Sequence, residues 1–107
     1  MSDPHVTMMA ELGRAARGAA RRLAALSADE RRVALETAAR ALRQAEGPIL
    51  AANAEDMEAA RQRDLPDALL DRLRLDSSRV AAMAEGLDTV AALPDPVDRV
   101  LDSWQRP

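Results

Sequence analysis

The 107-residue sequence predicts a mainly α-helical chain of about five helices, followed by one short β-strand near the carboxyl end. Three observations support this fold class. Apolar residues recur at spacings of three and four along most of the chain, which places them on one face of a helix. Alanine, the strongest helix former, occurs 24 times. Proline and glycine punctuate the pattern at Gly47 and Pro48, and again at Pro94 and Pro96.

The first predicted helix has an apolar stripe with arginines mostly on the opposite face. The stripe consists of Met9, Leu12, Ala16, Ala19, Leu23 and Leu26, and the arginines are Arg14, Arg17, Arg21 and Arg22. Ser27 interrupts this pattern and, with Glu30 three residues later, forms a capping box that starts the next helix. We therefore expect a first helix that ends before Ser27.

The second helix is expected from about Ala28 to Glu46. Its apolar stripe is formed by Leu35, Ala38, Leu42 and Ala45. We expect Gly47 to end it in a left-handed conformation, because glycine has no Cβ to clash, and we expect Pro48 to fit the first turn of a third helix. The third helix, which carries Ile49, Ala52, Met57 and Ala60 on its stripe, should end near Arg63 or Asp64.

Leu65 and Pro66 open a short fourth helical segment, and a fifth helix follows it. The apolar residues are Leu69, Leu70, Leu73 and Leu75 in the fourth segment, and Val80, Met83, Leu87 and Val90 in the fifth helix. Asp76 or Ser77 is expected to cap the fifth helix. A short strand is predicted at about Arg99 to Trp104. The sequence thus divides into a helical segment, residues 1–93, and a Pro-rich link with a first strand, residues 94–107.

Composition argues against several classes of function. The 15 basic residues are all arginine and are outnumbered by 18 acidic residues, so the net charge of −3 favours neither nucleic acid nor an anionic membrane as a partner. The absence of cysteine removes a thiol nucleophile and a cysteine metal site from the chain, and His5 alone cannot build a histidine metal site. Without a secretory signal or a long apolar run, we expect a cytoplasmic protein.

Two clusters of charged residues could carry chemistry. Asp71 and Arg72 lie among leucines, where the arginine could hold a carboxylate or phosphate, although a surface ion pair is the simpler interpretation. Asn53, Glu55 and Asp56, with Glu58, could bind a hard cation or exchange protons. No cation-binding loop accompanies them, so we interpret them as an acidic solvated face on which Asn53 bonds to neighbouring backbone.

Two pairs of arginines flank the junction between the first two predicted helices. They are Arg21 with Arg22 and Arg31 with Arg32. A phosphate could bind there, but nearby acidic residues make pairing within one helix the simpler account. The chain contains no Gly-rich phosphate loop and no nucleophile elbow. The sequence therefore nominates no catalytic, cofactor-binding or metal-binding residue.

Three segments in the second half of the sequence resemble a known protein family. They are PILAANAEDMEAAR (Pro48 to Arg61), LLDRLRL (Leu69 to Leu75) and VAALPDPVDRVLDSWQRP (Val90 to Pro107). In this order they resemble the amino-terminal part of gamma-glutamyl phosphate reductase, also called glutamate-5-semialdehyde dehydrogenase. The match is best from Ser27 to Pro107. It implies an α/β parent of the aldehyde dehydrogenase type, with a nucleotide-binding domain, a catalytic domain and a small oligomerisation element. Whether the protein forms a homo-oligomer is therefore left open.

The resemblance also implies an activity for the parent protein. That activity is the NADPH-dependent reduction of L-glutamyl 5-phosphate to L-glutamate 5-semialdehyde and phosphate in proline biosynthesis, by way of a cysteine thiolate. The family's cofactor domain and cysteine would lie beyond Pro107, so the 107 residues alone are not expected to be active. Whether Asp71 or Arg72 contacts substrate stays open.

Two hypotheses follow. In the first, the chain is the amino-terminal helical segment of such a reductase and packs on its nucleotide-binding domain. In the second, it is a short stand-alone helical interaction module without catalysis, which docks on a partner through one of its apolar stripes. A strand left without a partner at the carboxyl end argues against the second hypothesis. The two are distinguished by whether a cofactor domain and a cysteine follow Pro107.

Overall fold

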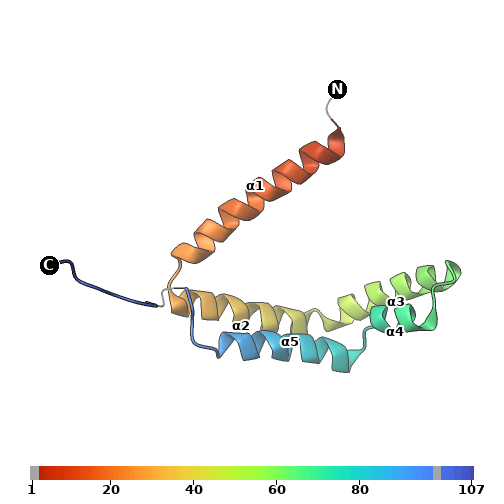
Figure 1. Cartoon of the computed structure of the whole chain (residues 1–107). Helices are drawn as coiled ribbons and strands as arrows, with labels where there is room; N and C mark the ends of the chain where they lie inside the picture. The colour runs from red at the N-terminus through yellow and green to blue at the C-terminus, as the bar shows by residue number, and fades with distance from the viewer. Residues whose placement is uncertain (1–2, 98–99) are drawn as a thin grey trace. The chain divides into compact units, whose positions relative to one another are not determined.

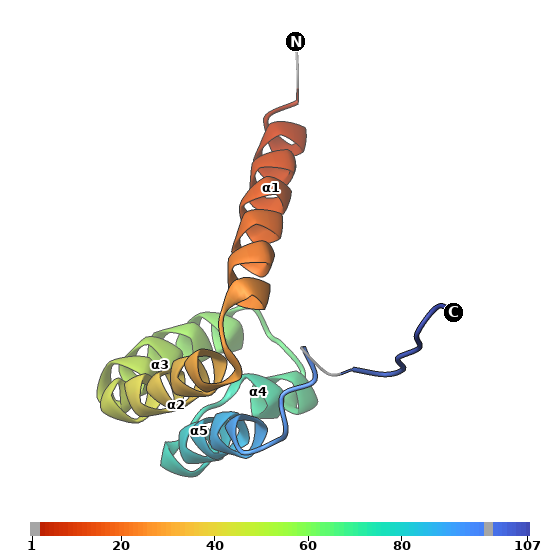
Figure 2. The same ribbon diagram turned by 90° about the vertical axis from the view of Figure 1, so that its left-hand side faces the viewer.

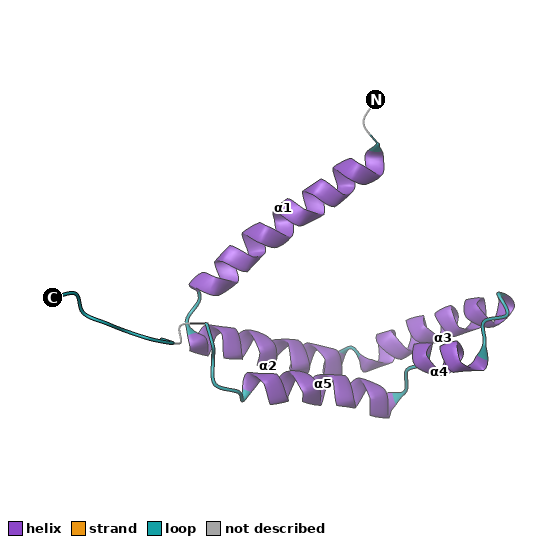
Figure 3. Ribbon diagram, in the orientation of Figure 1, coloured by secondary structure: helices purple, strands orange, loops and turns teal. Residues whose placement is uncertain are grey.

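The structure, a computed structural model, describes residues 3–97 and 100–107. Five helices and no strand occur within these residues, which confirms the mainly α fold class (Figure 1 and Figure 3). The helices are α1 (Pro4–Ala25), α2 (Ala28–Gln44), α3 (Glu46–Gln62), α4 (Asp67–Leu73) and α5 (Ser77–Ala91). The chain separates into two compact units, one of Met1–Arg31 with Pro94–Pro107 and the other of Arg32–Leu93.

Helix α1 starts earlier than its apolar stripe suggested. Asp3 is its N-cap and accepts a hydrogen bond from the backbone N–H of His5 at 2.9 Å, while Pro4 occupies the first turn, where a missing N–H costs nothing. His5 therefore lies in the first turn of a helix, with an exposed side chain. No residue of α1 is buried.

The capping box between the first two helices forms as predicted. The backbone N–H of Glu30 donates to Ser27 Oγ at 3.1 Å, and the backbone N–H of Ser27 donates to Glu30 Oε1 at 3.2 Å. Each side chain therefore satisfies a backbone donor that a helix start would leave without a partner. This local signal fixes where α2 begins.

The break between α2 and α3 differs from the predicted one. No glycine of the chain has a positive φ, so Gly47 is not a left-handed cap; it lies with Pro48 in the first turn of α3. Only Ala45 separates the two helices, and Ile49 N–H still bonds to the Ala45 carbonyl at 3.0 Å. Because Pro48 has no N–H to offer the carbonyl four residues earlier, the helical ladder breaks just before it. The helices nearly join end to end.

The end of α3 is closed by a left-handed aspartate. Asp64 has a φ of 54°, a conformation that short polar side chains tolerate best after glycine. The N–H of Leu65 bonds to the Ala60 carbonyl, and that of Asp64 to the Arg61 carbonyl, which together form a Schellman motif. The predicted helix end near Arg63 or Asp64 is confirmed, and Pro66 then occupies the N-cap position of α4 without a side-chain capping bond.

Within the unit of residues 32–93, the chain runs out along α2 and α3 and returns along α4 and α5. Helix α4 lies beside α3, and α5 lies beside α2 and the start of α3, as both ribbon views show (Figure 1 and Figure 2). An ion pair of 2.7 Å between Arg43 Nη2 and Asp88 Oδ2 joins α2 to α5. The chain reverses at residues 63–66 between α3 and α4, and residues 74–76 form an elbow between α4 and α5 (Figure 1).

The buried residues of this unit are mostly small. They are Ala39, Asn53, Met57, Ala60, Val80, Ala84 and Ala91. Ala39 and Ala84 are fully buried, which means that the helices approach closely where they have only a methyl group between them. Such a core buries little apolar area per residue, so we expect it to give a thin stability margin.

The predicted stripe of α5 is partly wrong. Val80 is 2% exposed, but Met83 and Val90 are 48% and 51% exposed. The buried face instead passes through Val80, Ala84 and Ala91, because alanine lets the neighbouring helices come closer than methionine or a second valine would. A periodic apolar pattern identified the helix correctly but not the side that is buried.

The carboxyl end contains no strand in the part that the structure describes. Residues 100–107 have no regular secondary structure, and Arg99, where the predicted strand begins, lies outside the described residues. The strand prediction is therefore wrong for Val100 to Trp104. A strand needs a neighbour to take up its backbone hydrogen bonds, and the described residues supply none.

Candidate functional site

Asn53 is the one buried polar side chain among the described residues, at 8% exposure. It lies on α3 and faces the elbow between α4 and α5. Its Nδ2 donates to the Leu73 carbonyl at 2.9 Å, and its Oδ1 accepts from the Leu75 N–H at 2.8 Å. The Asn53 amide therefore serves as the hydrogen-bond partner of backbone groups in residues 73–75, between the end of α4 and the start of α5.

The interpretation of Asn53 as part of an acidic surface is corrected by these contacts. It does bond to backbone, as expected, but to residues 20 and 22 positions away rather than to neighbours in its own helix. The residues around it behave as expected: Glu55, Asp56 and Glu58 are exposed. No group of three or more potential metal ligands exists among the described residues.

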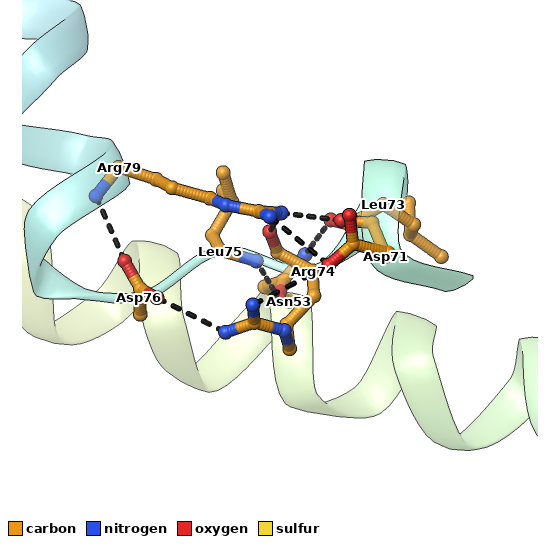
Figure 4. A network of polar contacts seen from close by, with 7 residues as sticks. All are labelled: Asn53, Asp71, Leu73, Arg74, Leu75, Asp76 and Arg79. Carbon is orange, nitrogen blue, oxygen red and sulfur yellow. Dashed lines mark hydrogen bonds and ion pairs between the residues drawn. The ribbon is translucent and has the colours of Figure 1, made fainter. Parts of the chain in front are cut away.

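A network of charged side chains surrounds the same elbow (Figure 4). Arg79 of α5 reaches back to α4, where its Nη1 donates to the Asp71 carbonyl and its Nη2 pairs with Asp71 Oδ1 at 3.1 Å. Arg79 Nη1 also donates to the Arg74 carbonyl. One guanidinium thus satisfies carbonyl groups that the end of α4 leaves without helical partners.

Asp76 closes the other side of the elbow. Its Oδ1 accepts from the backbone N–H of Arg79 at 2.8 Å, which makes it the N-cap of α5, and its Oδ2 pairs with Arg74 Nη1 at 3.0 Å. The backbone hydrogen bond from Arg79, followed by the side-chain bond from Arg74, lowers the pKa of Asp76 below its ordinary value. The prediction that Asp76 or Ser77 caps this helix is confirmed for Asp76.

The elbow network is balanced in charge and directed inward. Two arginines, Arg74 and Arg79, face two aspartates, Asp71 and Asp76, and Arg79 Nη1 also donates to two backbone carbonyls. A balanced network of this kind offers no excess positive charge to a phosphate or carboxylate. We conclude that its chemistry is structural: it fixes the elbow that joins α4 to α5.

The two residues of the Asp71–Arg72 motif do not act together in the structure. Asp71 pairs with Arg74, at 3.5 Å, and with Arg79, while the exposed Arg72 makes no ion pair within the described residues. The sequence missed Arg79, because nothing in a helical pattern indicates that a first-turn arginine folds back over the preceding segment. An arginine three residues after an N-cap aspartate is the signal that could have been weighed.

The second arginine cluster is divided in the same way. Arg32 pairs with Glu36 four residues on, at 3.1 Å, as intrahelical pairing predicts. Arg31 instead bonds to Asp95, 64 residues away, at 2.7 Å, and to carbonyls at the end of α1. For Arg31 the expectation of pairing within one helix therefore misses its main partner.

Most of the polar contacts described above satisfy the chain's own backbone groups and helix ends, while the pairs Arg32–Glu36 and Arg43–Asp88 lie on helix surfaces. No strand–turn–helix cradle of the kind that holds a dinucleotide occurs among the described residues. No helix within the described residues is long and apolar enough to cross a membrane.

Comparison with known proteins gives one consistent name. The chain is 52% identical over 107 residues to the gamma-glutamyl phosphate reductase of Methylocella silvestris, covering 99% of this chain and 25% of the relative. Identity is 53% over 100 residues to the reductase of Rhodospirillum rubrum, covering 94% and 23%, and 54% over 96 residues to that of Xylella fastidiosa, covering 90% and 23%. No family model matches the chain.

The resemblance predicted from the three sequence segments is therefore confirmed. The chain is similar to gamma-glutamyl phosphate reductases along almost its whole length, and it spans about a quarter of the length of the relatives it matches. The prediction that no residue of this chain is catalytic, cofactor-binding or metal-binding stays a prediction. So does the division of the sequence into residues 1–93 and 94–107.

Proposed function

We propose that this chain is the amino-terminal helical segment of a gamma-glutamyl phosphate reductase. The parent protein would be a cytoplasmic oxidoreductase that uses NADPH to reduce L-glutamyl 5-phosphate to L-glutamate 5-semialdehyde and phosphate, in proline biosynthesis. The observation that carries this proposal is identity of about half the residues over 99% of the chain to a protein of that name. Because the relatives are about four times longer, the reaction is assigned to the parent and not to these residues.

The chain's own contribution would be structural. It contains no cysteine, so the thiolate that the resemblance implies must come from elsewhere in the parent. Several large apolar side chains remain exposed, among them Val6, Met9 and Leu12 on α1 and Met83 and Val90 on α5. We propose that these surfaces, with the outer face of α2, pack on the nucleotide-binding domain of the parent.

A chimera tests this role. Residues 1–107 would replace the matching quarter of the Methylocella silvestris reductase, and activity would be followed in reverse as NADP⁺ reduction that depends on both glutamate semialdehyde and phosphate. We expect a folded chimera with activity within about tenfold of the unmodified enzyme, because about half of the residues in the exchanged segment are identical. Deletion of the segment should abolish activity, since it would expose the surface that the segment covers.

A second measurement tests whether the segment is part of a longer polypeptide in its own cells. The intact mass of the native protein, captured with an antibody against residues 1–107, should be several times the 11.6 kDa of the segment. A native mass of 11.6 kDa, or a chimera that folds but shows no phosphate-dependent activity, would overturn the proposal. Either result would favour a stand-alone interaction module.

A further inference from the structure

Arg31 bonds to two segments that lie far apart in the sequence. It occupies the first turns of α2, and its Nε donates to Asp95 Oδ2 at 2.7 Å. Its Nη1 donates to the carbonyls of Leu23 at 3.0 Å and Ala24 at 3.3 Å, and also to that of Leu26. The Arg31 and Asp95 side chains are only 14% and 19% exposed, which is low for an ion pair on a small helical protein.

The carbonyl contacts have a clear physical role. The last turn of a helix has carbonyl groups without intrahelical partners, and positive charge is favourable at that end of the helix dipole. Arginine can bond to these carbonyls and to a carboxylate at once, because its donors form a rigid planar fork. Arg31 therefore ends α1 from a position six residues beyond the last residue of that helix.

The carboxylate partner is equally well fixed. Asp95 lies between Pro94 and Pro96, whose rings restrict the backbone, and its Oδ1 accepts from the N–H of Val97 at 2.8 Å. The Arg31 side chain, and after it the Val97 N–H, lowers the pKa of Asp95 below its ordinary value. Both oxygens of this carboxylate are therefore occupied, one by Arg31 and one by its own loop.

We propose that Arg31, Asp95 and the carbonyls of Leu23, Ala24 and Leu26 form a clasp, which holds the Pro94–Val97 segment against the end of α1. Releasing the clasp frees the carboxyl-terminal segment while the helices stay folded. The clasp is a conformational device of this chain, and it holds whether or not the parent is a reductase. It would set the path on which the polypeptide leaves its helical part.

The absence of cysteine allows a direct test on the full chain. Nitroxide labels on Ala20→Cys and Val97→Cys, both at exposed positions, report the distance between α1 and the segment by pulsed electron paramagnetic resonance. We expect one narrow distance distribution in the otherwise unmodified chain. In Arg31→Gln and in Asp95→Asn the ratio of the narrow to the broad population should fall by roughly tenfold, as loss of a charged hydrogen bond predicts.

Two further variants make the test specific. Arg40→Gln removes the same charge at an exposed position further along α2 and should leave the distribution narrow. Arg31→Lys keeps the charge without the fork and should broaden the distribution. Asp95→Asn keeps the side-chain oxygen that bonds to Val97, so it tests the clasp even if Arg31→Gln lowers helicity. Unchanged narrow distributions in Arg31→Gln and Asp95→Asn, with unchanged circular dichroism, would overturn the clasp.

Discussion

Residues 32–93 and helix α1 are both rich in alanine and both helical, but they differ in what holds them. Every buried residue among those described belongs to residues 32–93, whereas α1 buries none of its 22 residues. In the first region, alanine lets helices approach and close around Asn53 and Met57. In α1, it supplies helix propensity alone, with caps at the two ends from Asp3 and Arg31.

The difference teaches that composition does not decide the role of alanine. Most of the stability of helices in proteins comes from packing of one face, and α1 has no buried residue, so α1 depends on its helix propensity and its end contacts. Residues 32–93 depend instead on close contact between methyl groups and on one buried amide. Substitutions matched between the two regions should therefore have unequal effects.

The largest expected effect comes from adding the same side chain to both regions. Ala84→Leu places three extra carbons at a fully buried site of α5 and should lower the free energy of unfolding by about 3 kcal/mol. Ala16→Leu makes the same change on the exposed surface of α1 and should shift stability by no more than about 0.5 kcal/mol. Urea unfolding followed by circular dichroism measures both; equal effects would erase the contrast between the regions.

The next effect concerns the buried amide. Asn53→Ala leaves the Leu75 N–H and the Leu73 carbonyl without their partner and should cost about 2 kcal/mol in free energy of unfolding. Asn53→Asp keeps the acceptor for Leu75 but cannot donate to Leu73, so it should also destabilise. Glu55→Ala, an exposed change two residues on in the same helix, serves as the control. If Asn53→Ala left the free energy of unfolding nearly unchanged, water would replace the amide without loss of stability.

Low pH should lower the stability of residues 32–93 through one aspartate, and that of the clasp at the end of α1 through another. Asp76, in residues 32–93, and Asp95, in the clasp, both have a lowered pKa because they accept hydrogen bonds as carboxylates. A group whose folded pKa is lowered stabilises the fold above its unfolded pKa, about 4, and this contribution disappears as pH falls through the folded pKa. Stability should therefore be level above about pH 5 and decline at lower pH.

Asn substitutions separate the two acid effects. Asp76→Asn keeps a capping oxygen for α5 but no longer titrates, so the decline of helix stability below about pH 4 should become shallower. Asp95→Asn should leave that decline unchanged and instead release the Pro94–Val97 segment at every pH. Thermal unfolding by circular dichroism from pH 7 to pH about 3 makes the comparison. If the stability of Asp76→Asn declined with falling pH as that of the unmodified chain does, other carboxylates would dominate the loss of stability in acid.

The smallest effect is expected for the ion pair between α2 and α5. Arg43 and Asp88 are 2.7 Å apart, but their side chains are 46% and 43% exposed. A double-mutant cycle with Arg43→Ala and Asp88→Ala should give a coupling of about 0.5 kcal/mol, and salt should reduce it further. A coupling above about 2 kcal/mol would show that this pair, and not the alanine contacts, holds α5 beside α2.

The sequence by itself determined where α2, α4 and α5 begin and where α3 ends. Ser27 with Glu30, Asp76 and Pro66 act on backbone groups within a few residues, so their signals are local and their outcomes were predicted. The segments that resemble gamma-glutamyl phosphate reductase could also be recognised without a structure, because sequence matches of that length are specific by themselves. The left-handed Gly47 failed, since Pro48 could break the helix without it.

Only the tertiary structure decided which faces are buried and which polar groups meet. Apolar periodicity gives α5 two candidate faces, and the closest helix approach selects the one with Ala84 over the one with Met83. Asn53, Arg31 and Arg79 find partners 8 to 64 residues away, which no local pattern encodes. Propensity and capping act along the chain, whereas burial and long-range hydrogen bonds depend on how its segments meet in space.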